Sequence, residues 1–95
     1  MKYALVGCGR IAKNHIKAAI ENGLEIVAVC DKNPAHIEEN LSAQGINNEK
    51  IARYIDCKNM LADERDIELA SIATESGSHA EIALQCIESG RHVII

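Results

Sequence analysis

The first twelve residues contain a short apolar segment that meets two closely spaced glycines and continues as a helical pattern. Residues 2–6 predict a β-strand, and Gly7-Cys8-Gly9-Arg10-Ile11-Ala12 follows it directly. Gly7 permits a tight turn, Gly9 lets the backbone approach a bound group, and Ala12 is small enough for close packing of helix on strand. This order of strand, glycine-rich turn and helix is typical of a nucleotide-binding site.

The start of the first predicted helix offers groups that hold a phosphate. The backbone N–H groups of Arg10, Ile11 and Ala12 are expected to be unsatisfied, at a helix end that carries about half a positive charge. Glycine pairs also mark ordinary turns, but the strand before and the helix after favour a pyrophosphate site. The Arg10 side chain either neutralises the pyrophosphate or lies exposed on the first turn, and both roles stay open.

Strand and helix patterns alternate along the whole chain. Asn33 before Pro34 predicts one helix start, and Ser78 with Glu81 predicts a capping box at another. The alternation predicts an α/β fold, a doubly wound parallel sheet of order 3-2-1-4-5 with right-handed crossovers and helices on both faces. The predicted strands are 2–6, 24–30, 51–55, 67–73 and 91–95, and the predicted helices are 10–22, 34–44, 57–62 and 78–90.

Composition narrows the classes of partner. The 95 residues, 47% of them hydrophobic, suffice for one small folded domain. A net charge of -4, two tyrosines and no Phe or Trp disfavour nucleic-acid binding. The four cysteines form no C-x-x-C pair, so neither a zinc site nor a disulfide framework is expected. No segment approaches the roughly 20 apolar residues of a membrane span, and we expect a cytoplasmic protein without membrane or nucleic-acid partners.

Asp31 ends the second predicted strand, 24 residues after Gly7. A carboxylate at this place can accept hydrogen bonds from the adenosine ribose hydroxyls and repels a 2′-phosphate, which favours NAD over NADP. The alternative is a solvated aspartate that merely ends a strand, with Lys32 beside it offsetting part of the repulsion.

The carboxyl end of the fourth predicted strand, residues 73–77, forms the other lip of the crevice in which open α/β sheets bind ligands. Thr74 is placed to contact the nicotinamide half of the cofactor, and Glu75 follows it. His79 either lines this cleft or packs at a helix N-terminus. No Ser/His/Asp or Cys/His arrangement and no cluster of metal ligands stands out, so the sequence predicts neither a nucleophile nor a metal site.

These residues together resemble the amino-terminal half of the Gfo/Idh/MocA (glucose-fructose oxidoreductase, inositol dehydrogenase) family of sugar dehydrogenases. The resemblance covers nearly all of the chain and rests on residues 7–12 and 27–31, on Thr74 with His79, and on Gly90-Arg91-His92-Val93. It implies a Rossmann fold and NAD(H)-dependent oxidation of a sugar, cyclitol or nucleotide-sugar hydroxyl. The expected cofactor-binding residues are Gly7, Gly9, Arg10, Ile11, Ala12, Asp31, Thr74, Glu75 and His79.

The sequence departs from the family pattern at Glu75, where the family usually has proline, so the loop geometry and the charge near the nicotinamide differ. In the family a Glu-Lys-Pro tripeptide follows the fifth strand, its lysine assists hydride transfer, and a carboxy-terminal domain supplies the substrate site. The resemblance therefore implies that residues 1–95 are a truncated dinucleotide-binding domain, inactive alone and without a catalytic residue. The general pattern also resembles members that oxidise N-acetylated nucleotide-sugar acids.

Two other functions stay open. The chain could be a standalone dinucleotide-sensing module whose assembly changes with redox state, or an S-adenosylmethionine-dependent methyltransferase, which shares a glycine-rich first turn and an acidic second strand end. Ala12 in place of a third glycine argues against the methyltransferase. Residues 93–95 predict an uncovered apolar edge strand, so a homodimer through this edge is expected.

Overall fold

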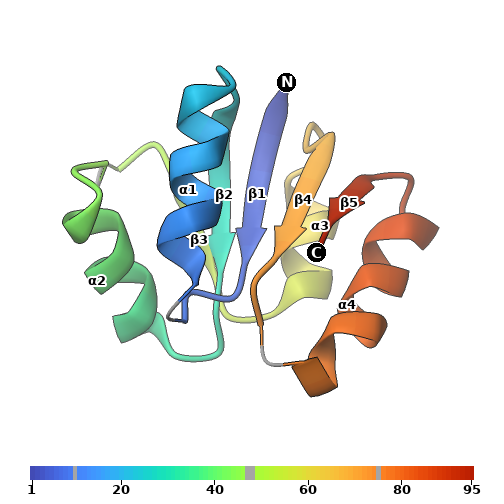
Figure 1. Ribbon diagram of the computed structural model, residues 1–95. Coiled ribbons are helices and arrows are strands. Elements are labelled where there is room, and N and C mark those ends of the chain that lie inside the picture. The colour runs from blue at the N-terminus through green and yellow to red at the C-terminus, as the bar shows by residue number, and fades with distance from the viewer. Residues whose placement is uncertain (10, 47–48, 75) are drawn as a thin grey trace.

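The computed structural model describes residues 1–9, 11–46, 49–74 and 76–95. Its strands form one parallel sheet in the order β3-β2-β1-β4-β5, which confirms the predicted topology (Figure 1). The elements along the chain are β1 (Lys2–Val6), α1 (Ala12–Glu21), β2 (Glu25–Cys30), α2 (Pro34–Ala43), β3 (Ala52–Tyr54), α3 (Cys57–Asp63), β4 (Leu69–Ile72), α4 (Ser76–Glu88) and β5 (His92–Ile94).

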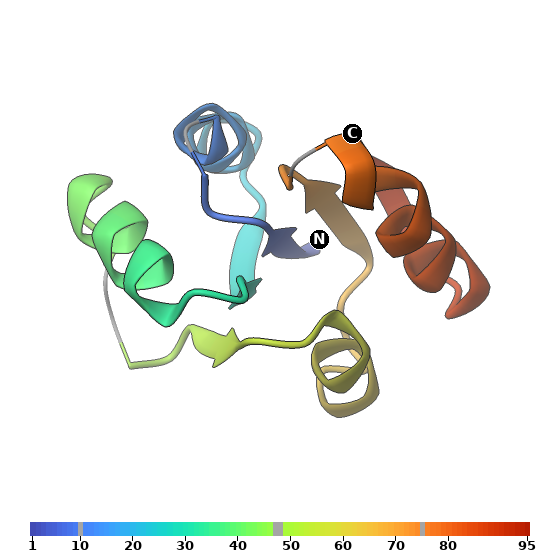
Figure 2. The same ribbon diagram turned by 90° about the horizontal axis from the view of Figure 1, so that it is seen from below.

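Helices cover both faces of the sheet, as expected for a doubly wound fold. Figure 2 shows α1 and α2 on one side of the strands and α3 and α4 on the other. Side chains of β1 alternate between these layers because successive residues of a strand point to opposite faces. Tyr3 and Leu5 pack in the core beneath α1 and α2, whereas Ala4 and Val6 pack in the core beneath α3 and α4. The central strand therefore serves two cores at once.

The cap predicted at Asn33 is confirmed, and two further helix ends are capped in the structure. Asn33 accepts the N–H of Ala35 through its side chain at the start of α2, and Asp56 accepts those of Lys58 and Asn59 at the start of α3. At the end of α1, Gly23 has a φ of 70° and its N–H donates to the carbonyl of Ile20. This is a Schellman motif, for which glycine is favoured because it adopts positive φ without strain.

The capping box predicted at Ser78 is wrong. Helix α4 begins at Ser76, so Ser78 lies inside its first turn and not at the N-cap. The residue before Ser76 lies outside the described ranges. The capping-box pattern depends only on residues that are neighbours in the sequence. It therefore does not show that α4 begins only a few residues after β4 ends at Ile72. Helix α1 likewise begins at Ala12 and not at Arg10.

The two outer strands are shorter than predicted. β3 and β5 each contain three residues, and each pairs with a neighbour along one side only. The exposed edge predicted at the carboxyl end of the chain is confirmed: β5 is the last strand in the sheet, and the side chains of Ile94 and Ile95 are exposed. Within the described residues, no helix is both long and apolar enough to cross a membrane.

Candidate functional site

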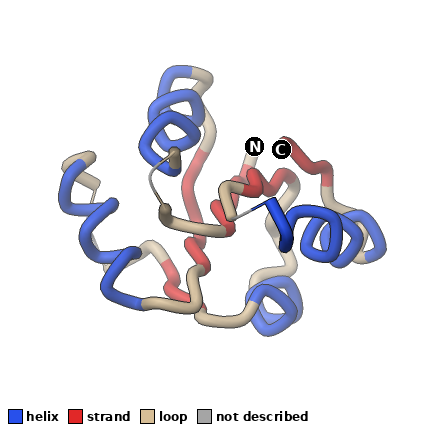
Figure 3. Tube along the Cα trace, turned by 60° about the horizontal axis from the view of Figure 1, so that its bottom comes forward, coloured by secondary structure: helices blue, strands red, loops and turns tan. Residues whose placement is uncertain are grey.

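The carboxyl ends of β1, β2 and β4 meet at one edge of the sheet. The Gly7 N–H donates to the Cys30 carbonyl and the Ala73 N–H donates to the Val6 carbonyl, both at 2.7 Å. The turn after β1 is therefore held between the ends of β2 and β4, and Figure 3 shows these loops gathered at one end of the sheet. Helices leave toward opposite faces on the two sides of this point, which is where open α/β sheets bind ligands.

Gly7 is required by the fold itself. Its φ is 93°, and a Cβ at this position would lie 2.6 Å from the Thr74 nitrogen and 2.7 Å from the Ala73 carbonyl carbon. Both obstacles are backbone atoms, so a side chain would force the turn after β1 away from the end of β4. The tight turn expected at Gly7 is thus confirmed, and its tightness comes from a contact with a residue far along the chain.

Gly9 is not required by the fold. It does not have a positive φ, and a Cβ there would meet no described atom within 4 Å. Open space therefore borders the backbone at Gly9. Among the described residues, the N–H groups of Gly9 and Ile11 have no backbone acceptor in this turn.

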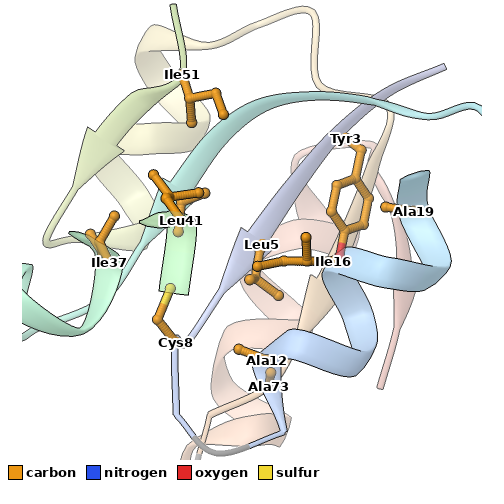
Figure 4. Packing of buried hydrophobic residues seen from close by; sticks show 11 residues of the cluster. Tyr3, Leu5, Cys8, Ala12, Ile16, Ala19, Ile37, Leu41, Ile51 and Ala73 are labelled. Carbon is orange, nitrogen blue, oxygen red and sulfur yellow. The ribbon is translucent and has the colours of Figure 1, made fainter. Parts of the chain in front are cut away.

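Ala12 contributes packing. Its side chain is fully buried, and Figure 4 shows it beside Ala73 of the opposite lip. The expectation that its N–H lacks an acceptor is wrong, because this group donates to the Gly9 carbonyl at 3.1 Å in the turn that precedes α1. The small residue in the third motif position thus lets α1 approach the end of β4.

Asp31 is held by the glycine-rich turn. Its Oδ2 accepts the Cys8 N–H at 2.7 Å, and its Oδ1 accepts the Asn33 N–H at 2.8 Å. The side chain is only 14% exposed, so the interpretation of Asp31 as a solvated strand end is wrong. Each carboxylate oxygen has a second lone pair that remains free to accept a hydroxyl. The site therefore presents a fixed, partly buried negative charge at the end of β2.

Asn40 on α2 holds the same turn from the other side. Its Nδ2 donates to the Cys8 carbonyl at 2.6 Å and to the His36 carbonyl at 3.0 Å. Asp31 and Asn40 thus fix both backbone polar groups of Cys8. Asn40 was not predicted from the sequence, although asparagine in a helix interior is unfavourable without a compensating contact and therefore signals such a contact.

Thr74 presents an unpaired hydroxyl at the opposite lip. Its Oγ1 is buried and has no hydrogen-bond partner among the described residues. The His79 Nε2 donates to the Thr74 carbonyl, which ties the first turn of α4 to the end of β4.

Burial, followed by the charge of His79, lowers the pKa of His15 on α1. The charge of His79 thus acts on His15, an effect that was not predicted from the sequence.

The described residues fit a dinucleotide. Among these residues, open space and N–H groups without a backbone acceptor lie at Gly9 and Ile11, carboxylate lone pairs at Asp31, and an orphaned hydroxyl at Thr74. Arg10 and Glu75 lie outside the described residues, so their roles stay predictions. No group of three or more potential metal ligands is found within the described residues. The arrangement is suited to holding an anionic ligand in place.

Comparison with known proteins agrees with this geometry. Residues 1–95 match the sequence profile of the Gfo/Idh/MocA "Oxidoreductase family, NAD-binding Rossmann fold". The WlbA dehydrogenase from Bordetella pertussis, solved in complex with NADH and UDP-GlcNAcA, superposes with a TM-score of 0.83 at 36% identity, covering 98% of this chain and 28% of that one.

Two curated relatives are similar over the same region. D-apiose dehydrogenase of Paraburkholderia graminis is 34% identical over 94% of this chain and 23% of its own length. Inositol 2-dehydrogenase of Salmonella typhimurium is 27% identical over 98% of this chain and 27% of its own length. The chain spans about a quarter of these relatives. It belongs to the Gfo/Idh/MocA oxidoreductase family and corresponds to the family's NAD-binding Rossmann domain.

Proposed function

We propose that this chain binds NAD(H) at the carboxyl edge of its sheet. The pyrophosphate lies beside Gly9 and the Ile11 N–H, the adenosine ribose hydroxyls donate to Asp31, and the nicotinamide half lies near Thr74. The observation that carries the proposal is the open space at Gly9, because nothing in the chain's own packing requires glycine there. His79 acts indirectly, by holding the Thr74 carbonyl.

The cofactor, when bound, supplies or accepts a hydride, and the residues of this chain position it. We assign the hydroxyl of a sugar, cyclitol or nucleotide sugar as the group that is oxidised, because the similar proteins include dehydrogenases of inositol and apiose and one solved with a nucleotide sugar. These 95 residues alone are expected to bind the cofactor without oxidising such a substrate. The described groups at the crevice are suited to binding and include no assigned proton acceptor for a hydroxyl.

Titration of the purified chain with NADH tests the proposal. The chain contains no tryptophan, so the change in nicotinamide fluorescence on binding is read without protein background, and calorimetry gives an independent affinity. We expect saturable binding of NADH and none of S-adenosylmethionine. If the folded chain did not bind NADH at about millimolar concentration, the proposal would be overturned. A Kd of this size corresponds to a binding free energy of roughly -4 kcal/mol. Preferential binding of S-adenosylmethionine would instead establish the methyltransferase.

The apolar edge at β5 supports self-association. Ile94 and Ile95 are 48% and 67% exposed, and β5 has a neighbour on one side only. Unpaired strand edges of this kind pair with other chains. We assign a homodimer through this edge, and light scattering at micromolar concentration tests it. A mass of one chain would contradict it, and a mass that changes between NAD and NADH would favour the sensing module.

A cytoplasmic location completes the proposal. All four cysteines, Cys8, Cys30, Cys57 and Cys86, are buried free thiols, which suits a reducing compartment. Fractionation of cells that express the tagged chain tests this assignment, and recovery from a secreted fraction would contradict it.

A further inference from the structure

His36 stands beside the carboxylate that the proposed function assigns to the adenosine ribose. Its Nδ1 is 3.8 Å from Oδ2 of Asp31, and its Nε2 is 3.4 Å from Nδ2 of Asn33. The His36 side chain is 48% exposed, whereas that of Asp31 is 14% exposed. A ligand group that reaches Asp31 from solvent therefore comes close to the imidazole as well.

The carboxylate of Asp31 is held in a fixed position by hydrogen bonds. Both carboxylate oxygens accept backbone N–H groups, from Cys8 and from Asn33, and Cys8 is fixed in turn by Asn40. A phosphate on the ribose 2′-hydroxyl, which distinguishes NADP from NAD, would meet this charge in place. Lys32 offsets part of this repulsion, and a further positive charge nearby would relieve more of it.

We infer that His36 is a specificity-determining residue that makes the choice between NAD(H) and NADP(H) depend on pH. When the imidazole is protonated, it offsets the Asp31 charge and donates to the 2′-phosphate. When it is neutral, only Lys32 offsets the carboxylate, and the 2′-phosphate binds more weakly. Histidine is suited to this role because its charge changes near neutral pH. The inference rests on the proposed function, since it concerns the same site.

Other ionisable groups surround His36. The Cys8 thiol stays neutral, because burial, followed by the charge of Asp31, raises its pKa to about 12. Lysine, arginine and carboxylate side chains do not ordinarily titrate between about pH 5.5 and about pH 8. The charged groups on the neighbouring turn, on α2 and on β3 are Asp31, Lys32, Glu38, Glu39 and Arg53, with Arg53 paired to Glu38 at 2.9 Å.

The test compares the affinities of NADH and NADPH at about pH 5.5 and about pH 8 in the wild-type chain, His36→Gln and His36→Lys. The 2′-phosphate, like other phosphate monoesters, titrates near pH 6, and His36→Gln measures that contribution without the imidazole. The Gln variant keeps hydrogen-bonding capacity without a charge, and the Lys variant keeps a permanent charge. His92→Gln, at an exposed position on β5, is the matched histidine control.

On acidification, the NADPH-to-NADH affinity ratio should rise roughly three- to tenfold more in the wild type than in His36→Gln, as expected for one partly screened charge. His36→Lys should show the higher ratio at both pH values, and His92→Gln should follow the wild type. An equal rise in wild type and His36→Gln would overturn this inference and leave NADH binding intact. Failure of the wild type to bind NADH at about pH 8 would overturn the proposed function together with it.

Discussion

The Oδ2 atom of Asp31 accepts the backbone N–H of Cys8 at 2.7 Å, which ties the end of β2 to the glycine-rich turn after β1. The carboxylate expected to receive the ribose is thus also the group that shapes the turn expected to receive the pyrophosphate. Charge-assisted hydrogen bonds of this kind are stronger than neutral ones. Loss of the Asp31 charge should therefore affect both ends of the adenosine diphosphate half of the site.

For Asp31→Asn we predict at least about tenfold weaker NADH binding. Both carboxylate oxygens accept backbone N–H groups, so the side-chain NH2 of asparagine would have to face one of these donors. The matched control is Asp66→Asn, since the Asp66 side chain is 82% exposed and forms a long ion pair with Lys2. Calorimetric titration measures both affinities. If the two variants bound NADH equally well, the assigned role of Asp31 would be wrong.

Gly7→Ala should destabilise the domain by at least about 2 kcal/mol, from strain at positive φ and from displaced neighbours. Gly23→Ala is the control, because Gly23 also has a positive φ but a Cβ there would meet nothing within 4 Å. Its cost should be limited to about 1 kcal/mol. Urea unfolding followed by circular dichroism measures the free energy of unfolding of both variants. If both lost the same amount of stability, the contact between Gly7 and Thr74 would be unimportant.

Arg91 provides a test away from the crevice. Its guanidinium donates to the carbonyls of Ile67, Leu61, Glu64 and Ser89 at 2.9 to 3.2 Å, which fastens the end of α3 to the start of β5. Arg91→Met should lower the free energy of unfolding by about 2 kcal/mol, because these carbonyls lose a charged donor. Arg65→Met, at an exposed position, should change it by less than about 0.5 kcal/mol.

The lowered pKa of His15 should be visible in the pH dependence of the free energy of unfolding. Burial and the charge of His79 lower its pKa in the folded state, so the unfolded chain binds a proton more readily. Its contribution to stability is therefore present above the ordinary histidine pKa of about 6.5 and is lost as the pH falls through that value. Unfolding at about pH 7.5 and about pH 5.5 should show a smaller loss in His15→Gln than in the wild type. A loss as large in the variant would rule out this coupling.

The strand order and the two glycines were predictable because they depend on local patterns. Alternating periodicities predict the sheet, and the turn between strand and helix predicts where a phosphate lies. Contacts between distant residues were not predictable: the Gly7 backbone abuts Thr74, and Asn40 reaches the Cys8 carbonyl. Ser78 was misassigned because a local capping pattern does not show where the preceding strand ends.

Gly7 is required by the fold, whereas Gly9 is proposed to serve the ligand, and Gly9→Ala distinguishes these two roles. The methyl group enters open space, so the free energy of unfolding should stay within about 0.5 kcal/mol of the wild type. NADH affinity should fall at least about tenfold, because the methyl group would occupy the place proposed for the pyrophosphate. A stable Gly9→Ala variant that binds NADH as tightly as the wild type would contradict the account.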